Sequence, residues 1–171
     1  MGALHESIRV ACPFSAAETY LCKYLERYGS ASDSTQFNMR LEPAALRGLA
    51  LTERDRGVHV AIRPLHDSAT PRSRYRIRWS PECTGPHTLF FGELALERLT
   101  DQETFSLRLD GRYEVPSDGV PGGASSAFSQ RIALATAAAL LAQIDAFVMH
   151  SAETERARRP HTNGVAHGYV G

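Results

Sequence analysis

Apolar and polar residues alternate along several short stretches of this chain, the pattern of β-strands with one buried and one wetted face. The clearest stretch is Gln36–Glu42, where Phe37, Met39 and Leu41 alternate with polar residues. Five other stretches share this period of two: Glu6–Cys12, Val58–Ile62, Arg74–Trp79, Thr88–Arg98 and Phe105–Val115. The pattern therefore predicts an antiparallel sheet.

One further strand is less regular. Leu46–Glu53 contains Gly48, and the turn Arg54–Gly57 after it predicts a hairpin with Val58–Ile62. With this strand the sheet has about seven strands.

Two segments have helical spacing instead. The first starts at Ser15, where Ser15 and Glu18 can form a capping box, and Gly29 ends it. The second is the long run Ser125–Glu155, which is rich in Ala and Leu. Its large apolar residues occupy more than half of the helical circumference, so other parts of the chain must surround it.

This long helix is apolar enough to raise the question of a membrane span. The run Ile132–Met149 approaches the required length, but Thr136, Gln143 and Asp145 lie inside it. An Asp at the bilayer centre costs about 2.5–3.5 kcal/mol. We therefore expect a core helix and no membrane span.

The composition fits one α+β domain. The 171 residues carry 19 basic and 19 acidic side chains, and this balance gives no support for nucleic acid as a partner. Cys12, Cys22 and Cys83 have no metal-binding spacing and are expected to be free thiols. No basic stretch followed by an apolar run marks a secretory signal at the N-terminus, so we expect a cytoplasmic protein. Residues 1–155 form the expected domain, and residues 156–171 an expected disordered tail.

The order of elements resembles the helix-grip proteins of the START-like (SRPBCC) superfamily. Local sequences agree: Trp79-Ser80-Pro81, then Phe90–Leu94 and Leu109–Pro116, resemble runs found in many bacterial members. The glycine-bearing segment Gly119–Gly123 resembles the turn before their last helix. The resemblance implies a curved antiparallel sheet that grips the C-terminal helix, with a short helical segment between strands 1 and 2.

The resemblance also implies a cavity between sheet and helix that holds a small apolar molecule. The predicted lining consists of the inward strand residues and four residues of the helix. These are Phe37, Met39, Leu41, Val60, Ile62, Tyr75, Ile77, Trp79, Phe90, Leu107, Leu109 and Tyr113, with Phe128, Ile132, Ala135 and Ala139. The alternative for the same residues is a filled hydrophobic core.

An enzyme is the rival interpretation, because the family includes polyketide aromatase/cyclases. Such an enzyme needs ionisable groups in the cavity, and Arg63, His66 and His87 near strand ends are the candidates. No nucleophile motif, phosphate-binding loop or metal-binding histidine pair is present in the sequence. We therefore expect binding rather than catalysis, with no metal and no cofactor.

A homodimer through the C-terminal helix is a further possibility. Phe128 and Ile132 point away from Leu134, Leu141 and Val148 when successive residues are placed about 100° apart. A sheet covers one side of a helix only. Loops, the N-terminal helix or a second copy of the chain must cover the other set.

Overall fold

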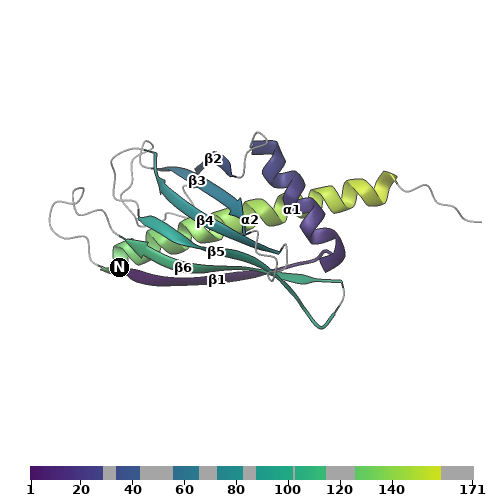
Figure 1. Ribbon diagram of the computed structural model, residues 1–171, viewed down its shortest axis with the longest axis horizontal. Coiled ribbons are helices and arrows are strands. Elements are labelled where there is room, and N and C mark those ends of the chain that lie inside the picture. Colours follow the sequence, from purple (N-terminus) through teal and green to yellow (C-terminus); the bar gives the residue numbers. More distant parts are fainter. Residues whose placement is uncertain are drawn as a thin grey trace, which may run out of the picture.

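The computed structural model describes residues 1–28, 34–42, 56–65, 73–82, 88–101, 103–114 and 126–158. Within these residues the elements are β1 (Gly2–Val10), α1 (Phe14–Tyr28), β2 (Thr35–Arg40), β3 (Gly57–Pro64), β4 (Arg74–Pro81), β5 (Leu89–Arg98), β6 (Phe105–Glu114) and α2 (Ser126–Arg158). The predicted α+β class is confirmed, with a short helix between the first two strands and a long C-terminal helix (Figure 1).

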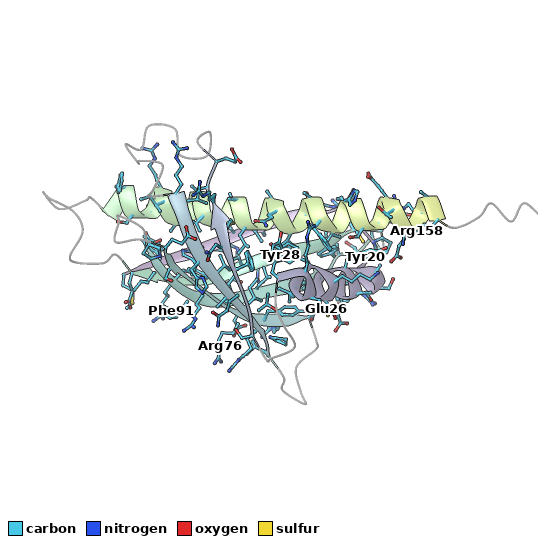
Figure 2. All side chains as sticks on the ribbon, turned by 90° about the horizontal axis from the view of Figure 1, so that it is seen from above. Tyr20, Glu26, Tyr28, Arg76, Phe91 and Arg158 are labelled. Atoms are coloured by element: carbon cyan, nitrogen blue, oxygen red, sulfur yellow. The ribbon has the colours of Figure 1, made fainter. Side chains whose placement is uncertain are left out.

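The described strands form one antiparallel sheet in the order β1-β6-β5-β4-β3-β2. Consecutive strands are neighbours from β2 to β6, and the first strand pairs with the last. Both helices lie on the same side of this sheet (Figure 1). Figure 2 shows Phe91 and Arg76 on the opposite side from α2. The sheet therefore has an inner face, toward the helices, and an outer face.

The predicted hairpin into β3 is wrong. A strand has two edges, and β3 uses one for β2 and the other for β4, with Val60 facing both Phe37 and Trp79. Both edges of β3 are therefore occupied by other strands of the sheet. The predicted strand Leu46–Glu53 itself lies outside the described residues.

The period-two alternation is confirmed on β4. Tyr75, Ile77 and Trp79 are buried, whereas the arginines between them are exposed. On the outer face, Arg108 forms ion pairs with Glu97 at 2.7 Å and with Asp110 at 2.5 Å, and Arg74 lies 3.8 Å from Glu93. Opposite charges on neighbouring strands thus pair for Arg74 and Arg108.

Helix α1 begins at Phe14, one residue before the predicted Ser15. The amide groups of Ala16 and Ala17 both donate to the Pro13 carbonyl, at 3.0 and 3.2 Å, and this closes the first turn. Ser15 therefore lies inside the helix, and the predicted capping box does not mark its start. The apolar stripe of α1 is buried as predicted, with Leu21 and Tyr24 almost fully enclosed.

Helix α2 packs against β1 and against α1. It is long and apolar enough to cross a membrane by length and composition, but here it is a core helix of the fold. Its fully buried stripe, at helical spacing, consists of Ser129, Ile132, Ala133, Thr136, Ala137, Leu140, Leu141, Ile144 and Val148. Helical structure continues to Arg158, three residues beyond the predicted end, and the rest of the predicted tail lies outside the described residues.

The C-terminal half of α2 is covered by α1. The Tyr20 hydroxyl donates to Glu155 at 3.0 Å, and the Lys23 ammonium lies 2.8 Å from the same carboxylate. The rings of Tyr24 and Phe147 meet edge to face, with 5.4 Å between centroids. The sequence left open whether loops, the N-terminal helix or a second copy of the chain covers this helix. At the C-terminal half of α2, the N-terminal helix does so.

Candidate functional site

A single row of inward residues crosses the whole sheet. Through the pairing register, Phe37 faces Val60, Val60 faces Trp79, Trp79 faces Phe90, Phe90 faces Tyr113, and Tyr113 faces Gly2. Trp79 and Phe90 stack with 3.9 Å between ring centroids and 11° between planes. Four aromatic side chains on one row give the inner face an aromatic wall.

Two glycines make room for this wall. Gly92 and Gly111 face each other on β5 and β6, in the next row of the sheet. A Cβ atom on either would lie 2.5 Å from the Cζ atom of Phe90. The Phe90 ring therefore occupies the space that side chains on both glycines would need, and it stacks on Trp79.

Three buried polar atoms near this end of the core have no hydrogen-bond partner. They are Trp79 Nε1, Thr88 Oγ1 and Ser129 Oγ, and their residues are at most 2% exposed. Trp79 and Thr88 flank Phe90 on β4 and at the start of β5. Ser129 lies in the first turns of α2, which begins beside the N-terminal end of β1 (Figure 1).

Unpaired buried polar groups are uncommon, because each costs about 1–3 kcal/mol relative to a hydrogen-bonded group. Trp79 can only donate a hydrogen bond, whereas the two hydroxyls can donate or accept. Each of the three atoms is available to bond with a polar atom of a bound molecule or with ordered water. This combination of aromatic wall and unpaired polar atoms is the candidate binding site.

The predicted lining residues on the strands all turn inward. Phe37, Met39, Leu41, Val60, Ile62, Tyr75, Ile77, Trp79, Phe90, Leu107, Leu109 and Tyr113 are at most 7% exposed. Of the four predicted helix residues, Ile132 is fully buried, whereas Phe128, Ala135 and Ala139 are half-buried. The predicted helical face was therefore rotated from the observed one, which is centred on Ala133, Ala137 and Leu140.

Sequence reasoning missed Thr88 and Ser129. Thr88 was assigned only as the first residue of a strand, and Ser129 as part of a helix. A Ser or Thr among apolar neighbours is the one local signal, and it does not distinguish a partnered hydroxyl from an unpartnered one. Thr136 illustrates the difficulty, because its equally buried hydroxyl donates to the Ile132 carbonyl at 2.8 Å.

Among the described residues no Asp, Glu, His, Lys or Arg side chain is fully buried. Glu6 on β1 faces inward beside Leu109 but is half-buried at the sheet edge. The predicted candidate Arg63 is exposed, and His66 and His87 lie outside the described residues. Burial raises the pKa of Tyr24 and of Tyr75 above the usual value, so both phenols are neutral at pH 7.

The described residues form no cluster of metal ligands. In the described part of the chain, no three His, Cys, Asp or Glu side chains gather where they could hold a metal ion. Cys12 and Cys22, the two cysteines in that part, are free thiols. The chemistry offered by the described site is therefore hydrogen bonding and aromatic contact.

A six-stranded antiparallel sheet with a long helix across its inner face defines a helix-grip domain. Comparison with solved structures gives the same result. The chain is similar to the ZhuI aromatase/cyclase of a Streptomyces species, with a TM-score of 0.57 and 14% identity over 91% of this chain and 96% of that one. It is also similar to a conserved protein of Geobacillus kaustophilus, with a TM-score of 0.54 and 17% identity over 90% and 97% of the two chains.

A protein of Thermus thermophilus gives a TM-score of 0.56, with 12% identity over 88% of this chain and 99% of that one. No model of a protein family matches the chain. No curated protein sequence matches it either. At these identities the likeness establishes the fold, which is that of the START-like helix-grip proteins.

Proposed function

We propose that this protein binds a small, uncharged, largely apolar molecule between the inner face of the sheet and α2. The observation that carries the proposal is the group of three buried, unpaired polar atoms on Trp79, Thr88 and Ser129. Ligand sites of this kind combine an apolar lining with a few polar atoms that orient the ligand. Solved structures of the same fold include a named aromatase/cyclase, which supports a role in handling small molecules.

The ligand class follows from the lining. Stacked rings favour a flat or apolar body, and the three polar atoms favour oxygen acceptors on it. A charged ligand would need a buried counter-charge, and none of the described side chains supplies one. The ligand that fits best is neutral.

Catalysis of the aromatase/cyclase type is the rival function. It requires at least two ionisable groups at the ligand, positioned to move protons. The absence of a fully buried acid or base among the described residues favours binding alone. His66 and His87 are the positions at which a substitution should be tried first if the purified protein transforms a ligand.

The test uses Nile red, a neutral apolar dye with a carbonyl group. We expect saturable binding to the wild type, and native mass spectrometry to find a neutral compound that co-purifies with it. Thr88→Val and Trp79→Phe each remove one hydrogen-bond donor, so dye binding should weaken about threefold to tenfold.

Thr136→Val is the matched control, because it removes a buried hydroxyl that already has a partner. It should leave dye binding unchanged. If the wild type binds no dye and releases no compound, the proposed function is wrong.

A further inference from the structure

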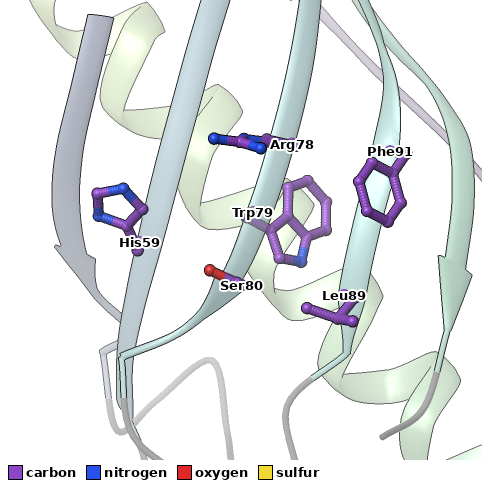
Figure 3. Close-up of a pocket in the computed structure, with 6 residues that line it drawn as sticks. All are labelled: His59, Arg78, Trp79, Ser80, Leu89 and Phe91. Carbon is purple, nitrogen blue, oxygen red and sulfur yellow. The ribbon is translucent and has the colours of Figure 1, made fainter.

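The outer face of the sheet carries a second candidate site, distinct from the core. A depression of about 260 Å³ is lined by His59, Arg78, Trp79, Ser80, Leu89 and Phe91 (Figure 3). These residues come from β3, β4 and β5, and all except Trp79 are half-buried or exposed. The depression has room for a small ring with one or two substituents, and it is smaller than most drug-sized pockets.

Two outward positions of β5 break the pattern of the sheet. Leu89 and Phe91 are apolar, although outward residues elsewhere on this face are mostly charged. Phe91 is 54% exposed, and Met1 is the one other large hydrophobic residue exposed to a similar extent among those described. A single exposed ring needs no explanation by itself. A ring that borders a depression together with a second apolar side chain provides a surface on which a flat apolar group can rest.

Positive charge flanks this ring on both neighbouring strands. Arg78 faces Phe91 across β4 and β5, and Arg112 faces it across β5 and β6. Both arginines are exposed, and no carboxylate of the described residues pairs with either. By contrast, Arg74 and Arg108 on the same face have Glu93 and Glu97 as partners.

The imidazole on the other side of the depression is held in place. His59 Nδ1 lies 2.8 Å from Asn38 Oδ1, and its Nε2 lies 3.3 Å from Gln36 Oε1. The ring is therefore oriented by β2 before any ligand arrives. Figure 3 shows Arg78 on the strand between His59 and Phe91, so the guanidinium lies between an oriented ring and an exposed one.

From this arrangement we propose that the outer-face depression binds a small aromatic acid, whose ring rests on Phe91 and Leu89 and whose anionic group pairs with Arg78. The guanidinium can hold a carboxylate or a phosphate through two hydrogen bonds. The net charge of zero for the whole chain does not oppose this, because both residues directly opposite Phe91 are arginines, whereas the carboxylate of Glu114 lies one pair further along, opposite Leu89. The proposal is independent of the core site, which requires a neutral ligand.

The experiment titrates the ¹⁵N-labelled protein with 1-naphthoate and, separately, with 1-naphthyl phosphate, and follows backbone amide shifts. We expect saturable shifts on β3, β4 and β5 with at least one of the two acids, and the stronger of them identifies the preferred anion. Neutral 1-naphthalenemethanol and inorganic phosphate alone should each bind about tenfold more weakly, because each lacks one of the two contacts.

Three variants assign the contacts. Arg78→Gln and Phe91→Ser should each weaken binding of the acid about tenfold. Arg63→Gln removes the same charge from the same face outside the depression, and binding should stay within about twofold of the wild type. Circular dichroism verifies that the variants are folded.

Equal affinity of the wild type and Arg78→Gln for both acids would overturn the proposal, as would shifts confined to core residues. Nile red binding distinguishes this result from failure of the proposed core function. A protein that binds the acid but not the dye has the outer site alone, and one that binds the dye but not the acid has the core site alone.

Discussion

The Cζ atom of Phe90 lies where a side chain on Gly111 would begin, 2.5 Å from the position of a Cβ atom. Gly111 belongs to β6 and Phe90 to β5. The Phe90 ring can lie against the neighbouring strand because Gly111 has no side chain. The same ring stacks on the indole of Trp79. The position of the one tryptophan in the chain thus depends on a glycine two strands away.

The first prediction concerns this glycine. Gly111→Ala would place its Cβ 2.4 Å from the Phe91 carbonyl oxygen as well as against Phe90, so backbone must move. We expect a loss of about 2–3 kcal/mol in unfolding free energy and a red shift of Trp79 emission. Urea unfolding followed by fluorescence measures both.

Gly57→Ala is the matched control for that measurement. Its Cβ would meet the flexible carboxylate end of Glu82, which can turn away, so the loss should stay below about 1 kcal/mol. Equal losses in the two variants would show that the Phe90 contact is not the cause.

A second prediction follows from the unpaired hydroxyl of Thr88. Thr88→Val keeps the shape and removes a buried group without a partner, so the ligand-free protein should gain about 1 kcal/mol in unfolding free energy. Thr136→Val removes a paired hydroxyl and should lose about 0.5–1 kcal/mol. The measurement is urea unfolding of protein freed of bound compounds by prior denaturation and refolding. A loss of stability in Thr88→Val would show that this hydroxyl has a partner in solution.

The third prediction concerns pH and Asp145 on α2. Burial raises the pKa of this carboxyl above its ordinary value of 3.8, so the folded protein holds the proton more tightly than the unfolded chain. The contribution of Asp145 to stability therefore falls as pH rises from about 3.8 through the raised pKa. Asp145→Asn should melt higher than the wild type at pH 7, with the difference shrinking toward pH 3.5.

Melting temperatures across that range test the pH prediction. Glu153→Gln, an exposed site on the same helix, controls for the loss of one negative charge. A constant offset of Asp145→Asn at every pH would mean that the carboxyl does not titrate differently in the two states.

The fourth prediction concerns the difference in thiol reactivity between Cys12 and Cys22. Cys12 is fully buried, and burial raises the pKa of its thiol, whereas Cys22 is exposed on α1. Because the thiolate is the reactive form, iodoacetamide at pH 8 should alkylate Cys22 and leave Cys12 unmodified in the folded protein. Peptide mass spectrometry reads both sites, and alkylation in urea shows that Cys12 is reactive once exposed. Rapid modification of Cys12 under native conditions would contradict its burial.

The sequence was sufficient to predict the inner face of the strands, because the side-chain period of a strand is two and needs no knowledge of neighbours. Tyr75, Ile77 and Trp79 were predicted to face inward on this ground alone, and they do. The face of α2 that is buried was harder to predict. Phe128 was predicted to face the sheet, yet it is half-buried, whereas Ala133 and Ala137 are fully buried.

Features that depend on distant residues could not be predicted in this way. Whether the hydroxyls of Thr88 and Ser129 have partners depends on what the folded chain brings near them. The depression beside Phe91 depends on the register of β3, β4 and β5. One local signal for it was present, since Leu89, Phe90 and Phe91 make both faces of β5 apolar at the same point.

The pairing of β1 with β6 has a consequence for how the chain acquires its structure. Gly2 lies opposite Tyr113 and Val10 opposite Phe105, so the partners in this strand pair are separated by 95 (105 − 10) to 111 (113 − 2) residues of sequence. Closing such a long segment is entropically costly, and proteins rich in distant contacts fold on timescales of about milliseconds to seconds. During synthesis β1 therefore cannot pair with β6 until β2 to β5 have left the ribosome. Glu6 places a charge on the inward, otherwise apolar face of β1. This charge opposes mispairing of β1 with other nascent chains before β6 is available.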